Sequence, residues 1–240
     1  MRFVIVLLLL CALVYGGYTI DVSTSNDVLA VQGLIANFDS TEIITETEPW
    51  VSTTPAFVTY AELAASYGDC AVDPLIEALG EEGQIRMAAA IGLEAVGPAA
   101  IKAKPQLVEM LESSSDLDNI LACGIVRGIG SDAVELVLLL QKQLHNDNFH
   151  VQYWACRALS SIGPGASPAA GELIVALREG LASVRRNAAI ALGNIAGELD
   201  GKSKWAVINA LEQTTFDYSV PVREAAVEAL TKLKTTGRGL

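Results

Sequence analysis

Small and apolar residues recur at intervals of 33 residues between residues 89 and 192 of this 240-residue chain. One column holds alanine in five successive copies, a second holds leucine or valine, and a third holds glycine in the first three copies. The columns are Ala89, Ala122, Ala155, Ala188 and Ala226; Leu93, Val126, Leu159, Leu192 and Leu230; and Gly97, Gly130 and Gly163. A fixed period of this length is typical of stacked supersecondary units. The last step is 38 residues, so we expect a longer turn at 214–218.

Each repeat carries the pattern of two helices. Between residues 184 and 195 the apolar side chains fall on one face at a period near 3.6, and a leucine column anchors a preceding helix. The face holds Val184, Ala188, Ala191, Leu192 and Ile195, and the leucine column holds Leu107, Leu140 and Leu173. Hydrophobic residues make up 51% of the chain and aromatic residues only 6%, which favours close-packed helices over a sheet. The predicted fold is all-α, an α-α superhelix (solenoid) of about five helical hairpins.

Turn residues indicate where successive hairpins meet. Gly97-Pro98 and Gly163-Pro164 should each end the preceding helix. We expect Asp73-Pro74 and Ser167-Pro168 to pair a capping side chain with a proline in the first turn of the next helix. Alanine in the column that faces the neighbouring repeat allows close approach of the backbones. Replacing Ala188 by Leu should therefore overpack the stack and cost about 1–3 kcal/mol.

Residues 1–17 have the layout of a signal peptide or N-terminal anchor. Arg2 gives a positive start, an apolar stretch runs from Phe3 to Val14, and small residues follow, with a cut expected after Gly16 or Gly17. The alternative is an uncleaved segment, in which residues 1–20 contact the membrane, although the apolar core is short for a span of about 20 residues. Residues 18–59 are predicted as a polar linker with a candidate short helix, and residues 60–240 as the repeat domain. We therefore expect an exported (periplasmic or extracellular, secreted) protein or one anchored in a membrane.

Two stretches carry a family resemblance. Residues 184–195 (VRRNAAIALGNI) and 222–230 (VREAAVEAL) resemble the second helix of a HEAT-like repeat, an armadillo-like helical unit also found in phycobilisome lyases. The resemblance extends over roughly residues 70–234. It implies that an arginine after the leading aliphatic residue is tied to an Asp or Asn of the turn between helices. Three copies hold that arginine and two do not, which predicts an interrupted polar ladder: Arg86, Arg185 and Arg223 fit, whereas Asn119 and Gln152 replace it.

The sequence carries no pattern that predicts a catalytic site, a cofactor or a metal. The hydroxylases among the relatives use His-Glu pairs, whereas the two histidines here, His145 and His150, do not precede Glu. Cys123 and Cys156 occupy the same place in successive repeats, and we expect two free buried thiols because stacked helices lie too far apart for a disulfide. The formal net charge of −12 argues against nonspecific nucleic-acid binding.

Unrepeated side chains on the second helices nominate a partner-binding face. Positions two, six and nine after the leading residue should point away from the core and line the concave side of the stack. The candidates are Met87, Ile91, Ile120, Arg127, Tyr153, Trp154, Arg157, Arg186 and Ile190. Aromatic, methionine and arginine residues are enriched in interface cores. The alternative is that these side chains cover an inner surface or pack against the N-terminal segment.

The leading functional hypothesis is a non-enzymatic protein-protein interaction scaffold that binds a protein or peptide along the concave face. The alternative is a phycobilin-lyase-like or other small-molecule-handling enzyme on the same fold, which the family resemblance implies. The expectation of export argues against a lyase of the photosynthetic cytoplasm.

Overall fold

A computed structural model describes residues 62 and 64–236. The predicted signal segment 1–17 and the predicted linker 18–59 lie outside these residues. Five helical hairpins follow one another along the described chain, and no strand occurs in it. They are α4 (Asp69–Ala78) with α5 (Gly83–Val96), α6 (Lys104–Glu112) with α7 (Asp116–Ile129), α8 (Val137–Gln143) with α9 (Phe149–Ile162), α10 (Ala170–Glu179) with α11 (Ala182–Ile195), and α12 (Gly201–Thr214) with α13 (Val220–Thr236).

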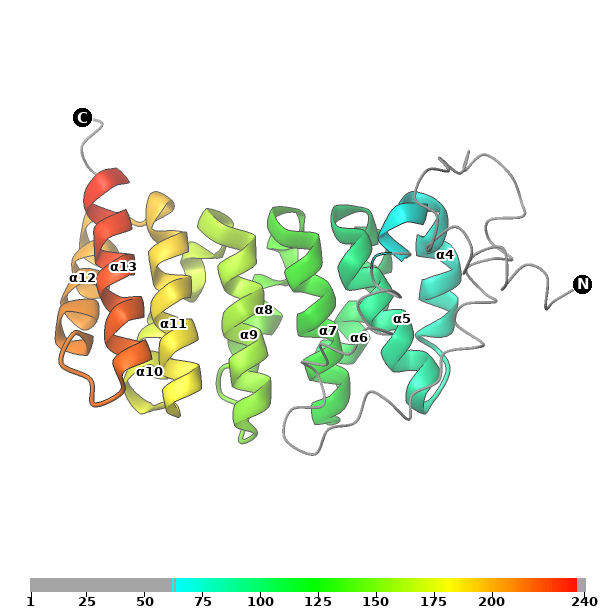
Figure 1. Ribbon diagram of the computed structural model, residues 1–240, viewed down its shortest axis with the longest axis horizontal. Helices are drawn as coiled ribbons and strands as arrows, with labels where there is room; N and C mark the ends of the chain where they lie inside the picture. The colour runs from blue at the N-terminus through cyan, green and yellow to red at the C-terminus, as the bar shows by residue number, and fades with distance from the viewer. Residues whose placement is uncertain (1–61, 63, 237–240) are drawn as a thin grey trace, which may run out of the picture.

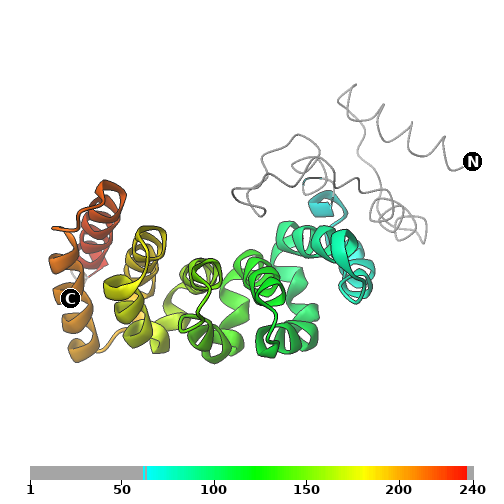
Figure 2. The same ribbon diagram turned by 90° about the horizontal axis from the view of Figure 1, so that it is seen from below.

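The hairpins stand side by side in chain order, in one row (Figure 1). Seen from below, the row is curved, and α5, α7, α9, α11 and α13 lie on its inner side (Figure 2). Each of these inner helices packs against the inner helix of the next repeat. The predicted α-α superhelix is therefore confirmed, and its concave side is formed by the second helix of each hairpin.

The alanine column explains why the inner helices pack so closely. All five alanines of the column are fully buried, at positions 89, 122, 155, 188 and 226. Two glycines bring neighbouring backbones closer still. A Cβ on Gly128 would overlap the Glu94 backbone of α5, and a Cβ on Gly193 would lie 2.9 Å from the Cα of Ala229 on α13. The small-residue columns of the sequence are thus the contacts between repeats.

The glycine column ends the second helix of the first three complete repeats. Gly97, Gly130 and Gly163 have φ values of 80°, 70° and 71°, a region that residues with a Cβ rarely adopt. Each begins a 3₁₀-helix that leads into the next hairpin, namely η2 (Gly97–Ala103), η3 (Gly130–Leu136) and η4 (Gly163–Ala169). Ala196 stands in this column after α11 with φ −62°, and there the 3₁₀-helix η5 is only three residues long (Ala196–Glu198).

The two predicted caps that pair a polar side chain with proline are wrong. Pro74 lies inside α4, because that helix begins earlier, after the positive φ of Gly68. Pro168 lies inside η4, and neither helix has a side-chain cap. The prolines that do stand in first turns are Pro98, Pro105, Pro164 and Pro221. Side-chain caps occur instead at Ser115, Asn148 and Asp200, whose oxygens accept from backbone N–H groups two or three residues ahead.

The extra residues of the last repeat lengthen the first helix of its hairpin. Thr214, expected in the longer turn, is the last residue of α12 and is buried, with its hydroxyl donating to the carbonyl of Ala210. The turn itself runs from Thr215 to Ser219. This turn has the same length as the turn 144–148 of the third hairpin, so the prediction of a longer turn is wrong. The extra residues lengthen α12 instead, which has 14 residues where the first helices of the other hairpins have 7 to 10.

Two cysteines stand at equivalent places on α7 and α9. Cys123 and Cys156 are fully buried free thiols, as predicted.

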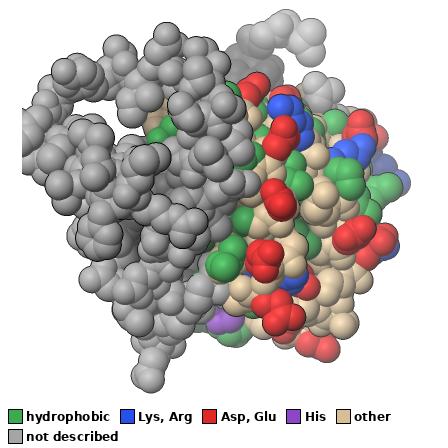
Figure 3. All heavy atoms as spheres, turned by 90° about the vertical axis from the view of Figure 1, so that its right-hand side faces the viewer, with side chains coloured by type: hydrophobic (Ala, Val, Ile, Leu, Met, Phe, Trp, Pro, Cys, Tyr) green, Lys and Arg blue, Asp and Glu red, His purple; other side chains and the backbone are tan. Residues whose placement is uncertain are grey.

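Within residues 62 and 64–236, no group of three or more His, Cys, Asp or Glu side chains could hold a metal ion. No helix in the same part of the chain is both long enough and apolar enough to cross a membrane. Asp and Glu side chains are scattered over the end formed by α4 and α5 (Figure 3).

Candidate functional site on the concave face

The nine candidate residues lie on four neighbouring inner helices, from α5 to α11. Arg186 is exposed, and six others are half-buried: Met87, Ile91, Arg127, Tyr153, Arg157 and Ile190. Ile120 and Trp154 are only 5% and 6% exposed, so the expectation that they present their side chains to a partner is wrong. They are buried because Ile120 sits where α7 packs between α5 and α9, and because two arginines lie against Trp154.

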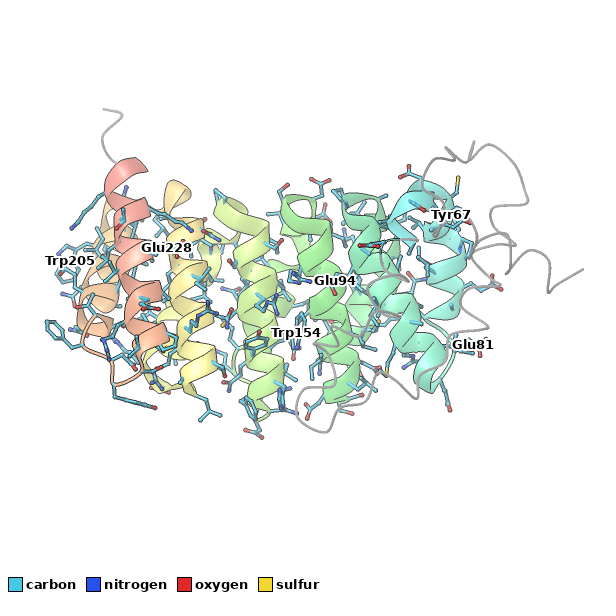
Figure 4. All side chains as sticks on the ribbon, in the orientation of Figure 1. Tyr67, Glu81, Glu94, Trp154, Trp205 and Glu228 are labelled. Carbon is cyan, nitrogen blue, oxygen red and sulfur yellow. The ribbon has the colours of Figure 1, made fainter. Side chains whose placement is uncertain are left out.

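Arg157 covers an aromatic pair on α9. Its guanidinium carbon lies 4.7 Å from the centre of the Trp154 ring and 5.4 Å from that of Tyr153. Its Nη1 donates to the Tyr153 hydroxyl at 3.1 Å, and the two rings meet edge to face with centroids 5.8 Å apart. Cation–π contact of this kind holds the guanidinium in place while its remaining N–H groups stay available. Figure 4 labels Trp154 on this face.

Arg127 approaches the same tryptophan from the preceding repeat. Its guanidinium carbon lies 5.8 Å from the Trp154 ring centre, and its Nη2 donates to the carboxylate of Glu94 on α5. Gly124 and Gly128 on α7 leave the room that the Glu94 side chain and backbone occupy. Burial lowers the pKa of Arg127, and the nearby positive charge of Arg157 lowers it further.

The charges along the concave face change sign from the middle to the ends. Arg127, Arg157 and Arg186 belong to the three central inner helices. Acidic side chains flank them, with Glu94 on α5 and Glu224 and Glu228 on α13, the last of which is paired with Lys232. Figure 4 shows Glu94 and Glu228 on either side of Trp154 along the row. The centre of the face therefore offers arginine donors on a chain that is acidic overall.

A family model described as HEAT repeats matches residues 105–193. The chain is a HEAT-like repeat protein. A comparison with curated proteins finds no match. Solved structures with the same fold include an engineered protein, at 22% identity with a TM-score of 0.62, over 85% of this chain and 98% of that one. Another is a designed armadillo repeat protein in complex with the peptide (KR)4, at 17% identity and TM-score 0.62, over 86% and 99% of the two chains. A third is an archaeal HEAT-like repeats protein from Thermococcus onnurineus, at 12% identity and TM-score 0.56, over 90% of each chain.

The polar ladder of this HEAT-like repeat protein is less interrupted than the sequence predicted. In all five repeats, the side chain after the leading residue donates to a backbone carbonyl of its own hairpin turn. These donors are Arg86, Asn119, Gln152, Arg185 and Arg223. Asparagine and glutamine keep that bond because an amide N–H can replace a guanidinium N–H at the same carbonyl. Only the ion pair to the next repeat is lost in the middle copies.

Two ladder arginines do reach across to the next repeat. Arg86 donates to Asp118 at 2.9 Å, and Arg185 donates to Asp217 with two N–H groups. The resemblance implied a bond within the hairpin turn, whereas these acidic partners belong to the following hairpin. These two arginines therefore tie the first repeat to the second and the fourth repeat to the fifth.

A polar pocket opens where the cross-repeat arginine is missing, between the second and third hairpins. Asn119 is only 2% exposed, and its Oδ1 has no hydrogen-bond partner among the described residues. Asn146 stands where Asp217 stands in the last repeat, five residues before the leading valine. The lining residues are Leu111, Glu112, Ser113, Ser114, Asn119, Lys142, Gln143 and Asn146. Sequence reasoning identified the substitution at 119 but not the pocket that it leaves.

The buried thiols of the HEAT-like repeats are unsuited to nucleophilic chemistry. Burial raises the pKa of Cys156 to about 12, and burial together with the neighbouring Cys156 raises the pKa of Cys123 above the normal range of a thiol. The reactive form of cysteine is the thiolate, which both environments disfavour. What the concave face offers chemically is hydrogen-bond donation and cation–π stacking, which serve binding.

Proposed function

We propose that this HEAT-like repeat protein is a non-enzymatic interaction scaffold that holds a protein or peptide segment along its concave face. Solenoids of this kind present extended concave binding surfaces and commonly serve as protein-interaction scaffolds. The designed armadillo repeat protein with the same fold was solved with a peptide. Its likeness to this chain concerns the fold and supports the proposal at that level.

The observation that carries the proposal is the position of Arg157. A guanidinium stacked on a buried tryptophan at the centre of a concave surface resembles the arginine and tryptophan anchors of interface hot spots. Within the described residues Arg157 forms no ion pair, and its only hydrogen bond is to Tyr153. Partly buried Met87, Ile91 and Ile190 extend the face on both sides with apolar surface.

A site-specific cross-linker tests this proposal in the cells that make the protein. A photoreactive phenylalanine derivative is placed at Tyr153 on the concave face or, as the matched aromatic control, at the exposed Trp205 of the outer helix α12. Light should link position 153 to a second protein, and Arg157→Gln should reduce that product. Cross-linking from position 205 but not from 153 would contradict the concave-face assignment.

We also propose that the scaffold acts outside the cytoplasm. The support is the sequence alone, which places a positive residue, an apolar stretch and small residues in the order of an export signal. Intact-mass measurement of the protein from its own cells distinguishes the two forms. A mass lacking about 16 or 17 residues indicates a cleaved signal, and a full mass in a membrane fraction indicates an anchor. A full mass in the cytoplasmic fraction would refute export.

A further inference from the structure

The concave face has a charge that differs from that of the whole chain. The chain carries a formal net charge of −12, yet the middle of this face holds three arginines, at 127, 157 and 186. Of these, only Arg127 is paired with an acid in the described structure, through Glu94. Charges of one sign on a surface select partners of the other sign and speed their association.

Two of these arginines have unused donors that point to an anionic ligand. Arg157 uses one N–H group on the Tyr153 hydroxyl. The Nε of Arg127 is buried and has no hydrogen-bond partner in the described residues. A buried donor without an acceptor carries a desolvation cost, which an acceptor on a ligand would remove. The planar fork of a guanidinium matches a carboxylate with two parallel hydrogen bonds.

The spacing of the inner helices limits the shape of the ligand. Neighbouring packed helices have axes about 10 Å apart, so the distance from α7 to α11 is about 20 Å. A peptide in the extended polyproline II conformation rises about 3.1 Å per residue and has three residues per turn, so about six residues cover this distance. Carboxylates about three residues apart lie on one face of such a peptide and would therefore meet successive arginines.

We infer that the concave face binds an extended acidic segment of a separate protein, with carboxylates about three residues apart and apolar residues between them. This inference rests on the proposed scaffold function and names the class of its partner. The carboxylates lie over Arg127, Arg157 and Arg186, and the apolar residues contact the surface around Tyr153 and Ile190. At the α13 end, the exposed carboxylate of Glu224, which forms no ion pair among the described residues, repels a longer acidic run.

Matched peptides bound to the full chain test the inference by fluorescence anisotropy. One nine-residue peptide carries glutamate at every third position among leucine and alanine. The others carry glutamine, lysine or phosphoserine at the same positions. The glutamate peptide should bind at least tenfold more tightly than the glutamine and lysine peptides, and its affinity should fall as salt is added.

Variants of the chain locate the effect on the concave face. Arg157→Gln should lower affinity for the glutamate peptide about tenfold. Arg186→Gln, at an exposed position that forms no ion pair among the described residues, should also lower it. Arg178→Gln, which removes an exposed arginine from the outer helix α10, should leave it unchanged. An equal loss with Arg178→Gln would overturn the inference.

Other outcomes identify other occupants and each overturns the inference. Equal binding of the glutamate and glutamine peptides, or tighter binding of the lysine peptide, refutes the acidic class. Binding of the phosphoserine peptide alone assigns the face to phosphorylated partners. The predicted linker 18–59 contains Glu42, Glu46 and Glu48. Peptide binding that appears only after these three residues are changed to Gln assigns the face to the chain's own acidic residues. Binding of none of the peptides refutes the inference, whereas the scaffold proposal fails separately if position 153 yields no cross-link.

Discussion

The guanidinium of Arg185 on α11 donates to both carboxylate oxygens of Asp217, from Nε at 2.8 Å and from Nη2 at 2.9 Å. Their side chains are only 8% and 11% exposed, and the guanidinium also lies 4.6 Å from the centre of the Tyr218 ring. The Asp217 hydrogen bond raises the pKa of Arg185, and the same bond lowers the pKa of Asp217. This pair ties the fourth repeat to the fifth.

Breaking the pair should destabilise the C-terminal end of the stack. Arg185→Met leaves Asp217 charged and largely buried without its partner, a change that costs about 3 kcal/mol or more in comparable sites. Urea unfolding followed by far-ultraviolet circular dichroism measures the loss. Arg178→Met, at an exposed position, is the matched control and should change stability by less than about 0.5 kcal/mol. A similar effect of both substitutions would show that the Arg185–Asp217 pair contributes little.

The lowered pKa of Asp217 predicts how the stabilisation depends on pH. A carboxyl group whose folded-state pKa lies below its unfolded value stabilises the fold above the unfolded pKa, and this contribution is lost as the pH falls through the folded pKa. The stability difference between wild type and Asp217→Asn should be constant above about pH 5 and shrink below about pH 4. Urea unfolding at a series of pH values measures it. A difference that grows on acidification would contradict the assignment of a lowered pKa.

Adding the missing arginine–aspartate ion pair between the second and third repeats should couple the effects of positions 119 and 146 on stability. Asn119→Arg fills the polar pocket, and Asn146→Asp supplies the acid that Arg185 finds in Asp217. The double variant should be more stable than the sum of the single effects by about 1 kcal/mol or more. A double-mutant cycle in urea measures this coupling energy. Zero coupling would mean that positions 119 and 146 do not meet across the repeats as Arg185 and Asp217 do.

The close contact of α5 and α7 predicts a sharp difference between two glycines. Gly128→Ala places a Cβ against the Glu94 backbone, so the two helices must separate, at a cost of about 1–3 kcal/mol. Gly171→Ala, on the outer helix α10, meets no atom within 4 Å and should be neutral or stabilising by up to about 1 kcal/mol. Thermal and urea unfolding compare the two variants. Equal stability of both would refute the close approach.

Residues that repeat for packing made the fold predictable from the sequence. The alanine column around Ala188 is required by close helix packing, and the glycine column beginning at Gly97 is required by a positive φ. The period of these two columns therefore predicted both the helical hairpins and the places where they join. The prediction that a helix begins at Pro74 was wrong because a proline alone does not determine where a helix begins. The start of this helix is determined by Gly68, which precedes it.

The sequence predicted where the candidate site lies but not which of its side chains are buried. Helical periodicity placed Tyr153, Arg157 and Arg186 on the inner face. It could not show that Trp154, one residue along, is buried, because its burial depends on two arginines from different repeats. The pocket beside Asn119 was not predicted. A pocket of this kind depends on the distance between two hairpins and on whether their side chains are long enough to fill the space between them.

Side-chain NMR of the arginines tests the concave-face assignment most directly. Addition of the glutamate peptide to the full chain, labelled with ¹⁵N, should shift the Nε–Hε signals of Arg127 and Arg157, because their donors gain carboxylate acceptors. The signal of Arg178 on the outer side should stay in place. Shifts confined to Arg178, or bound peptide with Arg127 and Arg157 unchanged, would contradict binding at the centre of the concave face.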